Sequence, residues 1–380
     1  MRELRVTAAR MLLPGGAWSG PAALTVAGGR IAAVEPGPAD SSGTLTPGLI
    51  DLHNNGAFGE DFASATSVGW RHVLASLAAR GVTAVQPTVI TAPLPAIIAA
   101  MGRMAAIVDA ADDGSVTRVL GVHLEGPFLS PTRRGAHRAE WLQDPVAALD
   151  VLLNDAATRR MLRTITLAPE RLGGLDAVRR LRALGVVVAI GHSDADATMA
   201  GDAAAAGVTM VTHLFNAMRP MGHRDPGLPG VALTDARLWC CLIGDAIHVG
   251  PLMCRIAFAA AGARLVLVTD SIAVAGLPPG STRMFGGAAV RVGADGAGRR
   301  PDGTLSGAGI VLDEAVRRMI AAGVDAAAVL HAATEAPANA LQRTDLGRLA
   351  AGACADLVLW NDAWMPQRVW IGGTEVAVAR

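Results

Sequence analysis

The sequence predicts an α/β protein: a (β/α)8 TIM-type barrel with a small β-sandwich domain built from both termini. Two observations support this prediction. Between about residues 48 and 345, short β-branched apolar runs alternate with alanine-rich stretches long enough to form helices. At both ends of the chain, short runs of alternating polarity are broken by glycine and proline instead. Repeated strand–helix units in a segment of this length favour a closed parallel barrel over an open sheet.

The predicted small domain takes residues 1–47 and 346–380, and the predicted barrel takes residues 48–345. Alternating polar and apolar residues indicate antiparallel strands with one solvated face. These runs are 4–13 and 23–36 near the N-terminus, and 356–361 and 368–379 near the C-terminus. Neither end by itself can bury a core, so we expect both ends to assemble into one unit with the barrel inserted between them.

Seven near-continuous apolar runs are the clearest barrel strands, because parallel strands are covered on both faces. They are 81–88, 118–125, 164–170, 185–192, 207–214, 238–245 and 264–270. Helical stretches follow several of them, at 172–183, 194–206 and 251–261. No GxGxxG motif opens a helix after the first strand, which weakens the alternative of a dinucleotide-binding fold.

The composition is that of a globular protein: 51% of the 380 residues are hydrophobic, 17% are charged, and the net charge is zero. Scattered basic residues predict neither a nucleic-acid partner nor an anionic membrane surface. The mean hydropathy is +0.37. However, the longest uncharged run, 81–102, contains Pro87, Pro93 and Pro95, which argue against a membrane-spanning helix.

The first residues include Arg2, Glu3 and Arg5 and no continuous apolar segment, so no signal peptide is expected. The four cysteines, Cys240, Cys241, Cys254 and Cys354, have no CxxC spacing. They are expected to be buried thiols in a reducing compartment. We therefore expect a cytoplasmic enzyme.

Polar residues stand where the apolar runs end, and in a barrel the active site gathers at the C-terminal ends of the strands. In chain order they are His53 with Asn55, Glu125, His192, His213, Asp245 with His248, and Asp270. One carboxylate and two neutral imidazoles, from Glu125, His192 and His213, suit Zn²⁺ or Fe²⁺ and leave a position for water. Asp270 can then accept the proton of that water.

Each of these residues can also serve a local structural purpose. Ser193 or Asp194 is expected to cap the helix that follows His192, and Ser306 can cap a helix near residue 309. His123 shares a strand face with Glu125, and we expect it to support the site rather than to bind a metal.

Four motifs lie at these strand ends: HLEGPF at 123–128, GHSDA at 191–195, THLFNAM at 212–218 and VTDS at 268–271. Together they resemble the motifs of the N-acetylglucosamine-6-phosphate deacetylases of the amidohydrolase superfamily. The resemblance extends over nearly the whole chain, to 46–56, 134–137, 224–230, 245–250, 302–307 and 346–360. It implies the fold described above and hydrolysis of N-acetyl-D-glucosamine 6-phosphate to D-glucosamine 6-phosphate and acetate.

The resemblance also implies roles for individual residues. Glu125, His192 and His213 fall at its metal ligands, Asp270 at its catalytic acid and base, and His137 at a histidine that contacts the acetyl group. Its substrate-binding positions fall on Ala136, Asn216, Ala217, Arg224, Asp245, Ala246, Ile247, His248, Leu305, Ser306 and Gly307. Arg224 matches an arginine that one subunit lends to the phosphate in its partner, which implies a homodimer. A guanidinium suits a phosphate dianion.

His53 and Asn55 replace the His-x-His pair with which two-metal amidohydrolases help to hold one ion. The neutral amide of Asn55 is a poor ligand for Zn²⁺. We therefore predict one divalent ion per subunit, Zn²⁺ first and Fe²⁺ second, with His53 and Asn55 near the site. A second, weakly held ion at His53 remains an alternative.

Three other functions remain open at this stage. The first is the same reaction on N-acetylgalactosamine 6-phosphate, which differs at one hydroxyl. The second is another amidohydrolase reaction, such as cyclic-amide hydrolysis, which leaves Arg224 and the 302–307 loop without a role. The third is a non-catalytic sugar-phosphate-binding member of the fold, which predicts missing ligands, whereas the ligands are present.

Overall fold

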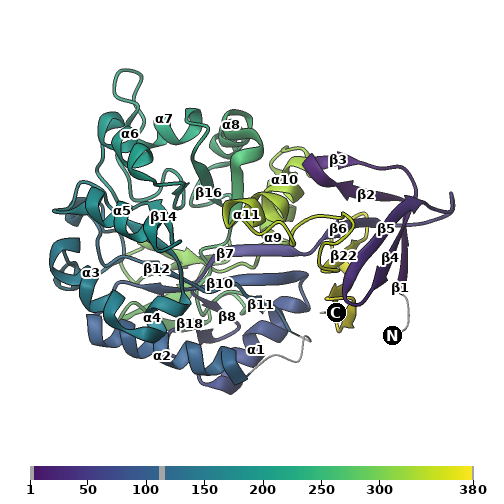
Figure 1. Cartoon of the computed structure of the whole chain (residues 1–380), viewed down its shortest axis with the longest axis horizontal. Helices are drawn as coiled ribbons and strands as arrows, with labels where there is room; N and C mark the ends of the chain where they lie inside the picture. The colour runs from purple at the N-terminus through teal and green to yellow at the C-terminus, as the bar shows by residue number, and fades with distance from the viewer. Residues whose placement is uncertain (1–3, 111–115, 379–380) are drawn as a thin grey trace.

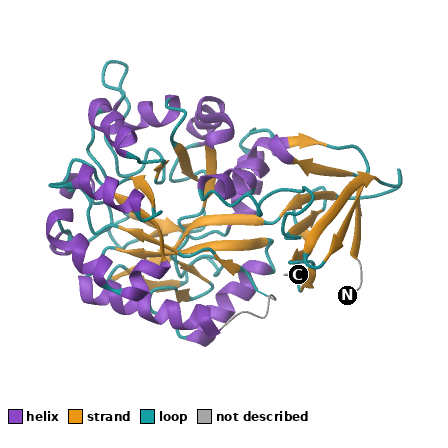
Figure 2. Ribbon diagram, in the orientation of Figure 1, coloured by secondary structure: helices purple, strands orange, loops and turns teal. Residues whose placement is uncertain are grey.

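A computed structural model describes residues 4–110 and 116–378 as a barrel with a smaller β unit beside it (Figure 1). The predicted domains also include residues 1–3, 111–115 and 379–380, which lie outside the described residues. Figure 2 shows that helices surround the barrel strands, whereas the smaller unit is made mainly of strands.

The barrel consists of eight parallel strands that are neighbours in a single order around the sheet. They are β7 (Leu49–Asn54), β10 (Val82–Ile90), β12 (Val122–Glu125), β13 (Leu162–Leu167), β14 (Val187–Ile190), β15 (Met210–Val211), β16 (Trp239–Ile243) and β17 (Leu265–Val268). A short strand, β11 (Arg118–Val119), pairs with the beginning of β10, and β12 pairs with its end. Every residue of β7, β12, β14 and β17 is buried, so the prediction of strands covered on both faces is confirmed.

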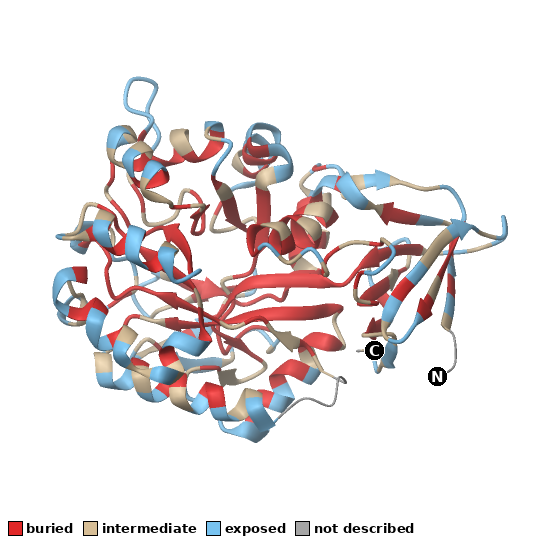
Figure 3. Ribbon diagram, in the orientation of Figure 1, coloured by how far each residue is buried: buried red, intermediate tan, exposed pale blue. Residues whose placement is uncertain are grey.

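Helices cover the outside of the barrel and expose their outer faces to solvent (Figure 3). They are α1 (Ser67–Ala78), α2 (Leu94–Ala110), α3 (Pro145–Asn154), α4 (Ala156–Met161), α5 (Gly174–Ala183), α6 (Ala197–Ala206), α7 (Gly227–Thr234), α8 (Pro251–Ala261), α9 (Leu312–Ala321), α10 (Ala326–Ala333) and α11 (Glu335–Ala340). The described helices include none that is long and apolar enough to cross a membrane.

Two predicted helix caps are wrong. Helix α6 begins at Ala197 and is capped by Asp196, whose side chain accepts a hydrogen bond from Met199 N at 2.8 Å. The side chain of Glu170 accepts hydrogen bonds from Ser193 Oγ and Asp194 N, at 2.7 and 2.6 Å, and the carboxylate of Asp194 accepts one from Arg133 Nε at 2.7 Å. Ser306 lies in a strand and caps no helix.

The barrel closes where β17 meets β7, through an isolated parallel bridge between Asn54 and Ser271. Asp51 stabilises this seam. Its fully buried carboxylate accepts hydrogen bonds from Thr269 Oγ1 at 2.6 Å and from Thr269 N at 3.2 Å. It also accepts from Asn54 Nδ2 at 3.1 Å and from His53 N at 3.3 Å. One side chain thus ties the first strand of the barrel to the segment directly before Asp270.

Replacing Asp51 with Ala is expected to lower the stability of the protein by about 2–4 kcal/mol, because several buried donors lose their acceptor at once. The measurement is the Tm by calorimetry or circular dichroism. Asp176→Asn is the matched control, since Asp176 is exposed and pairs with Arg179 one turn along its helix. Equal Tm values for the two variants would contradict the role of Asp51.

The smaller unit is a β-sandwich whose strands come from both ends of the chain, as predicted. One sheet contains β1 (Leu4–Ala8), β4 (Ala22–Ala27) and β5 (Arg30–Pro36). The other contains β24 (Thr374–Val376), β23 (Pro366–Ile371), β22 (Leu357–Trp360), β6 (Thr44–Pro47), β2 (Arg10–Leu13) and β3 (Ala17–Trp18). Side chains such as Leu24, Leu45 and Trp370 bring the two sheets into one apolar core. The domain boundaries after residues 47 and 345 stay a prediction.

A four-stranded antiparallel sheet follows β17, and no local sequence pattern predicts it. Its strands are β18 (Thr282–Phe285), β19 (Ala288–Val292), β20 (Ala297–Arg299) and β21 (Leu305–Ala308). We call it the inserted sheet. Phe285 and Val290 belong to its own small core, against which Ile90 at the end of β10 packs. The inserted sheet therefore lies against the C-terminal end of the barrel, where the catalytic residues are expected.

The remaining elements are short. They are β8 (Gly56–Ala57), β9 (Glu60–Asp61) and the 3-10 helices η1 (Pro14–Gly16), η2 (Pro131–Arg133), η3 (Ala139–Trp141) and η4 (Gly262–Arg264). All four cysteines are free; Cys240, Cys241 and Cys254 are buried as expected, and Cys354 is partly exposed. Burial raises the pKa of Cys240 to about 11, so this thiol stays protonated at neutral pH.

Candidate active site

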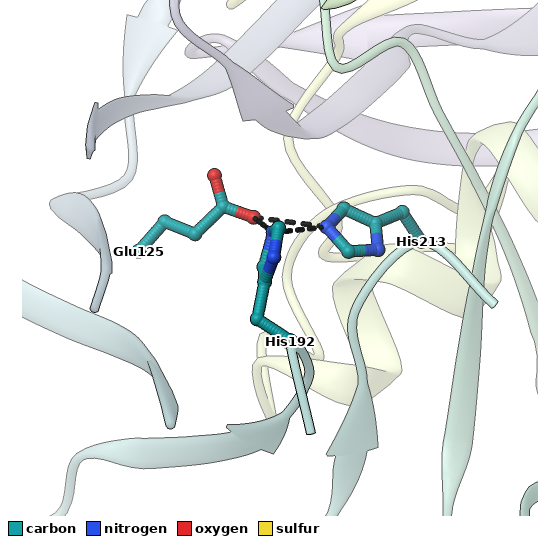
Figure 4. Close-up of side chains that lie close together, drawn as sticks. All are labelled: Glu125, His192 and His213. Carbon is teal, nitrogen blue, oxygen red and sulfur yellow. Dashed lines mark hydrogen bonds and ion pairs between the residues drawn. The ribbon is translucent and has the colours of Figure 1, made fainter. Parts of the chain in front are cut away.

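Glu125, His192 and His213 converge at the C-terminal end of the barrel (Figure 4). Glu125 is the last residue of β12, and each histidine stands two residues after its strand. His192 Nε2 and His213 Nε2 lie 3.2 and 3.0 Å from Glu125 Oε1 and 2.9 Å from each other. All three residues are buried. The structure thus brings the predicted metal ligands together from three different strands.

These three side chains fit a divalent cation. Ligand bonds of 2.0–2.1 Å in a tetrahedral site place the donor atoms about 3.3 Å apart, close to the separations observed here. His192 Nδ1 donates a hydrogen bond to Arg133 O at 2.9 Å, and this bond orients the ring with Nε2 toward the cluster. Burial lowers the pKa of His213, which favours the neutral imidazole that a metal requires.

The residues around Glu125 favour its ionised form. Burial by itself would raise the pKa of this carboxyl group. The charge of His53 and the close contacts with the imidazoles of His192 and His213 outweigh burial and hold the pKa of Glu125 well below its usual range. An ionised carboxylate therefore faces the two imidazoles.

Several predicted site residues adopt the left-handed backbone region, which is uncommon for residues other than glycine. The φ angles are 48° at His192, 32° at His213 and 50° at Asp270. Ala217 and Ala246 have φ angles of 50° and 60°. Such strain is known to cluster at functional sites, where the surrounding structure must stabilise it. The left-handed backbone at these residues thus sets the directions of their side chains, and it introduces local strain.

Asp270 stands two residues after β17 and faces the same cluster. Its Oδ1 accepts a hydrogen bond from Asn55 Nδ2 at 2.9 Å and lies 3.1 Å from His53 Nε2. His53 Nε2 also lies 3.4 Å from Glu125 Oε2. Burial disfavours a charged imidazole, but Asp270 and Glu125 outweigh it and raise the pKa of His53 to about 9. His53 and Asn55 thus orient the carboxylate of Asp270.

His53, Glu125 and Asp270 form a second group whose ligand atoms are close enough to hold a cation. This group shares Glu125 with the first. A protonated His53 already places a positive charge between the two carboxylates. One ion in the first group, with a second ion at His53 as the alternative, stays a prediction.

His137 lies beside the ligands in the loop that follows η2. Its ring packs edge-on against the ring of His192 with a centroid distance of 4.5 Å, and its Nε2 lies 3.8 Å from Glu125 Oε2. Burial and the neighbouring His192 lower the pKa of His137 to about 3. A neutral imidazole with one N–H group is therefore available next to the cluster.

These groups share a cavity of about 180 Å³. It is lined by the predicted residues Glu125, Ala136, His137, His192, His213, Asn216, Ala217, His248, Asp270, Leu305, Ser306 and Gly307. Asp245 is buried behind His248 and holds its Nδ1 at 2.6 Å. Ala246 and Ile247 form the turn between them and do not line the cavity.

Arg224 does not line this cavity in the single chain. It is exposed in the loop between β15 and α7, which projects from the barrel above α6 in Figure 1. A role for Arg224 in the site of a partner subunit is compatible with this position and stays a prediction.

Sequence reasoning missed other lining residues: Ile90, Gly135, Ile243, Phe285, Gly286 and Arg300. Ile90 is the last residue of β10 and Ile243 the last of β16, so the strand-end rule applied to apolar residues would have found them. Phe285, Gly286 and Arg300 belong to the inserted sheet and its loops, for which no local signal was recognised.

The chain is similar in sequence to a known protein family and to named deacetylases. A profile of the amidohydrolase family matches residues 44–376. The N-acetylgalactosamine-6-phosphate deacetylase of Escherichia coli O157:H7 is 36% identical over 375 residues, or 97% of this chain and 98% of that protein. The human N-acetylglucosamine-6-phosphate deacetylase is 38% identical over 342 residues, or 87% of this chain and 82% of that protein.

The fold is also similar to that of solved structures. One is a substituted form of N-acetyl-D-glucosamine-6-phosphate deacetylase from Mycobacterium smegmatis, in complex with N-acetyl-D-glucosamine-6-phosphate. It has a TM-score of 0.89 and 33% sequence identity, with 100% of both chains covered.

Proposed function

Because this chain belongs to the amidohydrolase family, we propose that it is a metal-dependent deacetylase of amino-sugar metabolism. It hydrolyses N-acetyl-D-glucosamine 6-phosphate to D-glucosamine 6-phosphate and acetate, as the names of its relatives indicate. The observation that carries the proposal is the convergence of Glu125, His192 and His213 in one cavity with Asp270 and His137.

Each residue has a distinct part in the reaction. A divalent ion held by Glu125, His192 and His213 would polarise the acetyl carbonyl and lower the pKa of an adjacent water. Asp270 accepts a proton from that water as the new C–O bond forms, and delivers it to the amine as the C–N bond breaks.

Neutral His137 donates its N–H group to the carbonyl oxygen, where one fixed donor is worth about 3 kcal/mol in the transition state. His248, held by Asp245, faces the sugar hydroxyls. Asn216, Ala217 and the segment 305–307 complete the contacts with the sugar phosphate in this proposal.

The direct test is release of acetate from N-acetyl-D-glucosamine 6-phosphate by the purified protein, assayed with and without added Zn²⁺ or Fe²⁺. N-acetyl-D-galactosamine 6-phosphate should be assayed side by side, because one relative is named for that epimer. We expect the larger kcat/KM for the glucosamine substrate. A larger kcat/KM for the galactosamine substrate would assign the galactosamine reaction. If neither sugar released acetate, the protein would be a non-catalytic binding protein.

We further propose a homodimer in which Arg224 reaches the phosphate bound by the partner subunit. Arg224→Gln should raise KM for the phosphorylated sugar by about tenfold to a hundredfold, since one charge-assisted hydrogen bond is lost. Its kcat/KM for unphosphorylated N-acetylglucosamine should change little. Equal losses on both sugars would contradict phosphate recognition, and a monomer in sedimentation experiments would contradict the composite site.

The resident ion in this proposal is Zn²⁺, one per subunit, with Fe²⁺ as the second choice, because both suit a carboxylate with two imidazoles. The proposed location is the cytoplasm. Four cysteines without a disulfide are compatible with a reducing compartment.

A further inference from the structure

Arg300 lies where the inserted sheet meets the loop that carries His137. It follows β20, and its backbone N donates a hydrogen bond to Thr304 O at 2.9 Å, which closes the turn that leads into β21. Its side chain reaches across this turn, and Nη2 donates to Ala136 O at 2.9 Å. The guanidinium group thus forms part of the cavity wall beside Leu305–Gly307.

The guanidinium of Arg300 forms no direct ion pair with the described part of the chain. Within residues 4–110 and 116–378, no carboxylate lies within ion-pair distance of this guanidinium, and its buried Nε has no hydrogen-bond partner. The neighbouring Arg299, in contrast, forms two hydrogen bonds with Asp295, at 2.8 and 2.7 Å. A partly buried cation without a counter-ion is costly, because desolvation is not compensated. Such a group is therefore expected to meet its counter-charge elsewhere.

A positive charge in this cavity is complementary to a phosphorylated ligand. Among the described residues that line it, Arg300 is the one with a fixed positive charge, whereas Glu125 and Asp270 are carboxylates. A sugar phosphate brings further negative charge into the same space. A guanidinium offers five N–H donors that match the oxygens of a phosphate. The bond to Ala136 uses one of them.

We propose that Arg300 is a specificity-determining residue, which meets the phosphate of the substrate from the same chain that supplies the catalytic groups. This inference rests on the proposed function and adds a second cation to it, independent of any partner subunit. Arg300 selects phosphorylated over neutral amino sugars, and its hydrogen bond to Ala136 holds the guanidinium in place.

The test compares Arg300→Gln with the matched control Arg299→Gln, using N-acetylglucosamine with and without the 6-phosphate. The expected result for Arg300→Gln is a KM for the phosphorylated sugar that rises by about tenfold to a hundredfold, with a small change in kcat. Its kcat/KM for the unphosphorylated sugar should stay near that of the wild type. Arg299→Gln should resemble the wild type on both sugars. Arg300→Lys should have an intermediate KM, because lysine keeps the positive charge but lacks the planar set of N–H donors of a guanidinium.

A second measurement is independent of turnover. Inorganic phosphate, titrated by calorimetry into each purified protein, should bind more weakly to Arg300→Gln than to the wild type and to Arg299→Gln. A similar loss of kcat on both sugars would overturn the proposal and assign Arg300 to holding the His137 loop. Unchanged KM and unchanged phosphate binding would also overturn it. If the wild type binds phosphate through Arg300 but releases no acetate, the proposed function fails and the anion site stands.

Discussion

Asp270→Asn is expected to lower kcat by about a hundredfold to ten-thousandfold, the range attributed to a positioned general acid and base. The amide has the shape of the carboxylate but accepts no proton from the attacking water. The fold should survive, because asparagine tolerates the left-handed backbone that Asp270 adopts, with a φ of 50°. The measurement is the steady-state rate of acetate release, together with the metal content of the variant.

The metal content of Asp270→Asn should equal that of the wild type, because Glu125, His192 and His213 are unchanged. Asp109→Asn is a suitable control, since Asp109 is an exposed carboxylate paired with Arg160 on the outside of the barrel. Near-normal turnover by Asp270→Asn would remove Asp270 from the mechanism. Loss of metal together with loss of turnover would make it a ligand instead.

Removal of metal is the second prediction with a large expected effect. Prolonged dialysis against a chelator should lower kcat by at least about a hundredfold, because a Lewis acid stabilises the transition state by several kcal/mol and each 1.4 kcal/mol is a factor of ten. Adding Zn²⁺ or Fe²⁺ after removal of the chelator should restore the rate. The same addition should raise the Tm, since the ion binds the folded state only.

The ratio of ion to subunit distinguishes the two candidate ligand groups. One ion per subunit is expected for Glu125, His192 and His213, and two ions would show that the group with His53 is also used. Full activity of the metal-free protein would contradict the proposed mechanism. The ratio of ion to subunit in His53→Ala distinguishes the two ligand groups further, because this substitution removes a ligand of the second group only.

The barrel could be predicted because its evidence is local. Runs such as 185–192 are apolar on both faces, and this pattern needs no knowledge of what covers them. Parallel strands then bring their C-terminal ends together, so His192, His213 and Asp270, each two residues after a strand, were expected to converge. The sandwich followed from the same reasoning, since neither terminus can bury its apolar face alone.

Helix starts and the inserted sheet could not be predicted in the same way. Asp196 rather than Ser193 or Asp194 caps α6, because two residues distant in sequence engage the earlier side chains: Glu170 accepts from the hydroxyl of Ser193, and Arg133 binds the carboxylate of Asp194. The strands between Thr282 and Ala308 are short and rich in glycine and arginine, so their own sequence has weak periodicity. Their core depends on Ile272 and Val274 and on the packing of Ile90.

By itself, then, the amino-acid sequence determined the strand–helix order, the two-ended sandwich and the identity of the residues at the strand ends, since hydrophobic periodicity and chain direction are local properties. Tertiary structure alone decided that Asp51 closes the barrel seam, that His53 and Asn55 orient Asp270, and that Arg300 enters the cavity without a direct ion pair to any described residue. These depend on contacts between segments far apart in the chain, such as residues 136 and 300. Their energies depend on burial and distance, which no local pattern records.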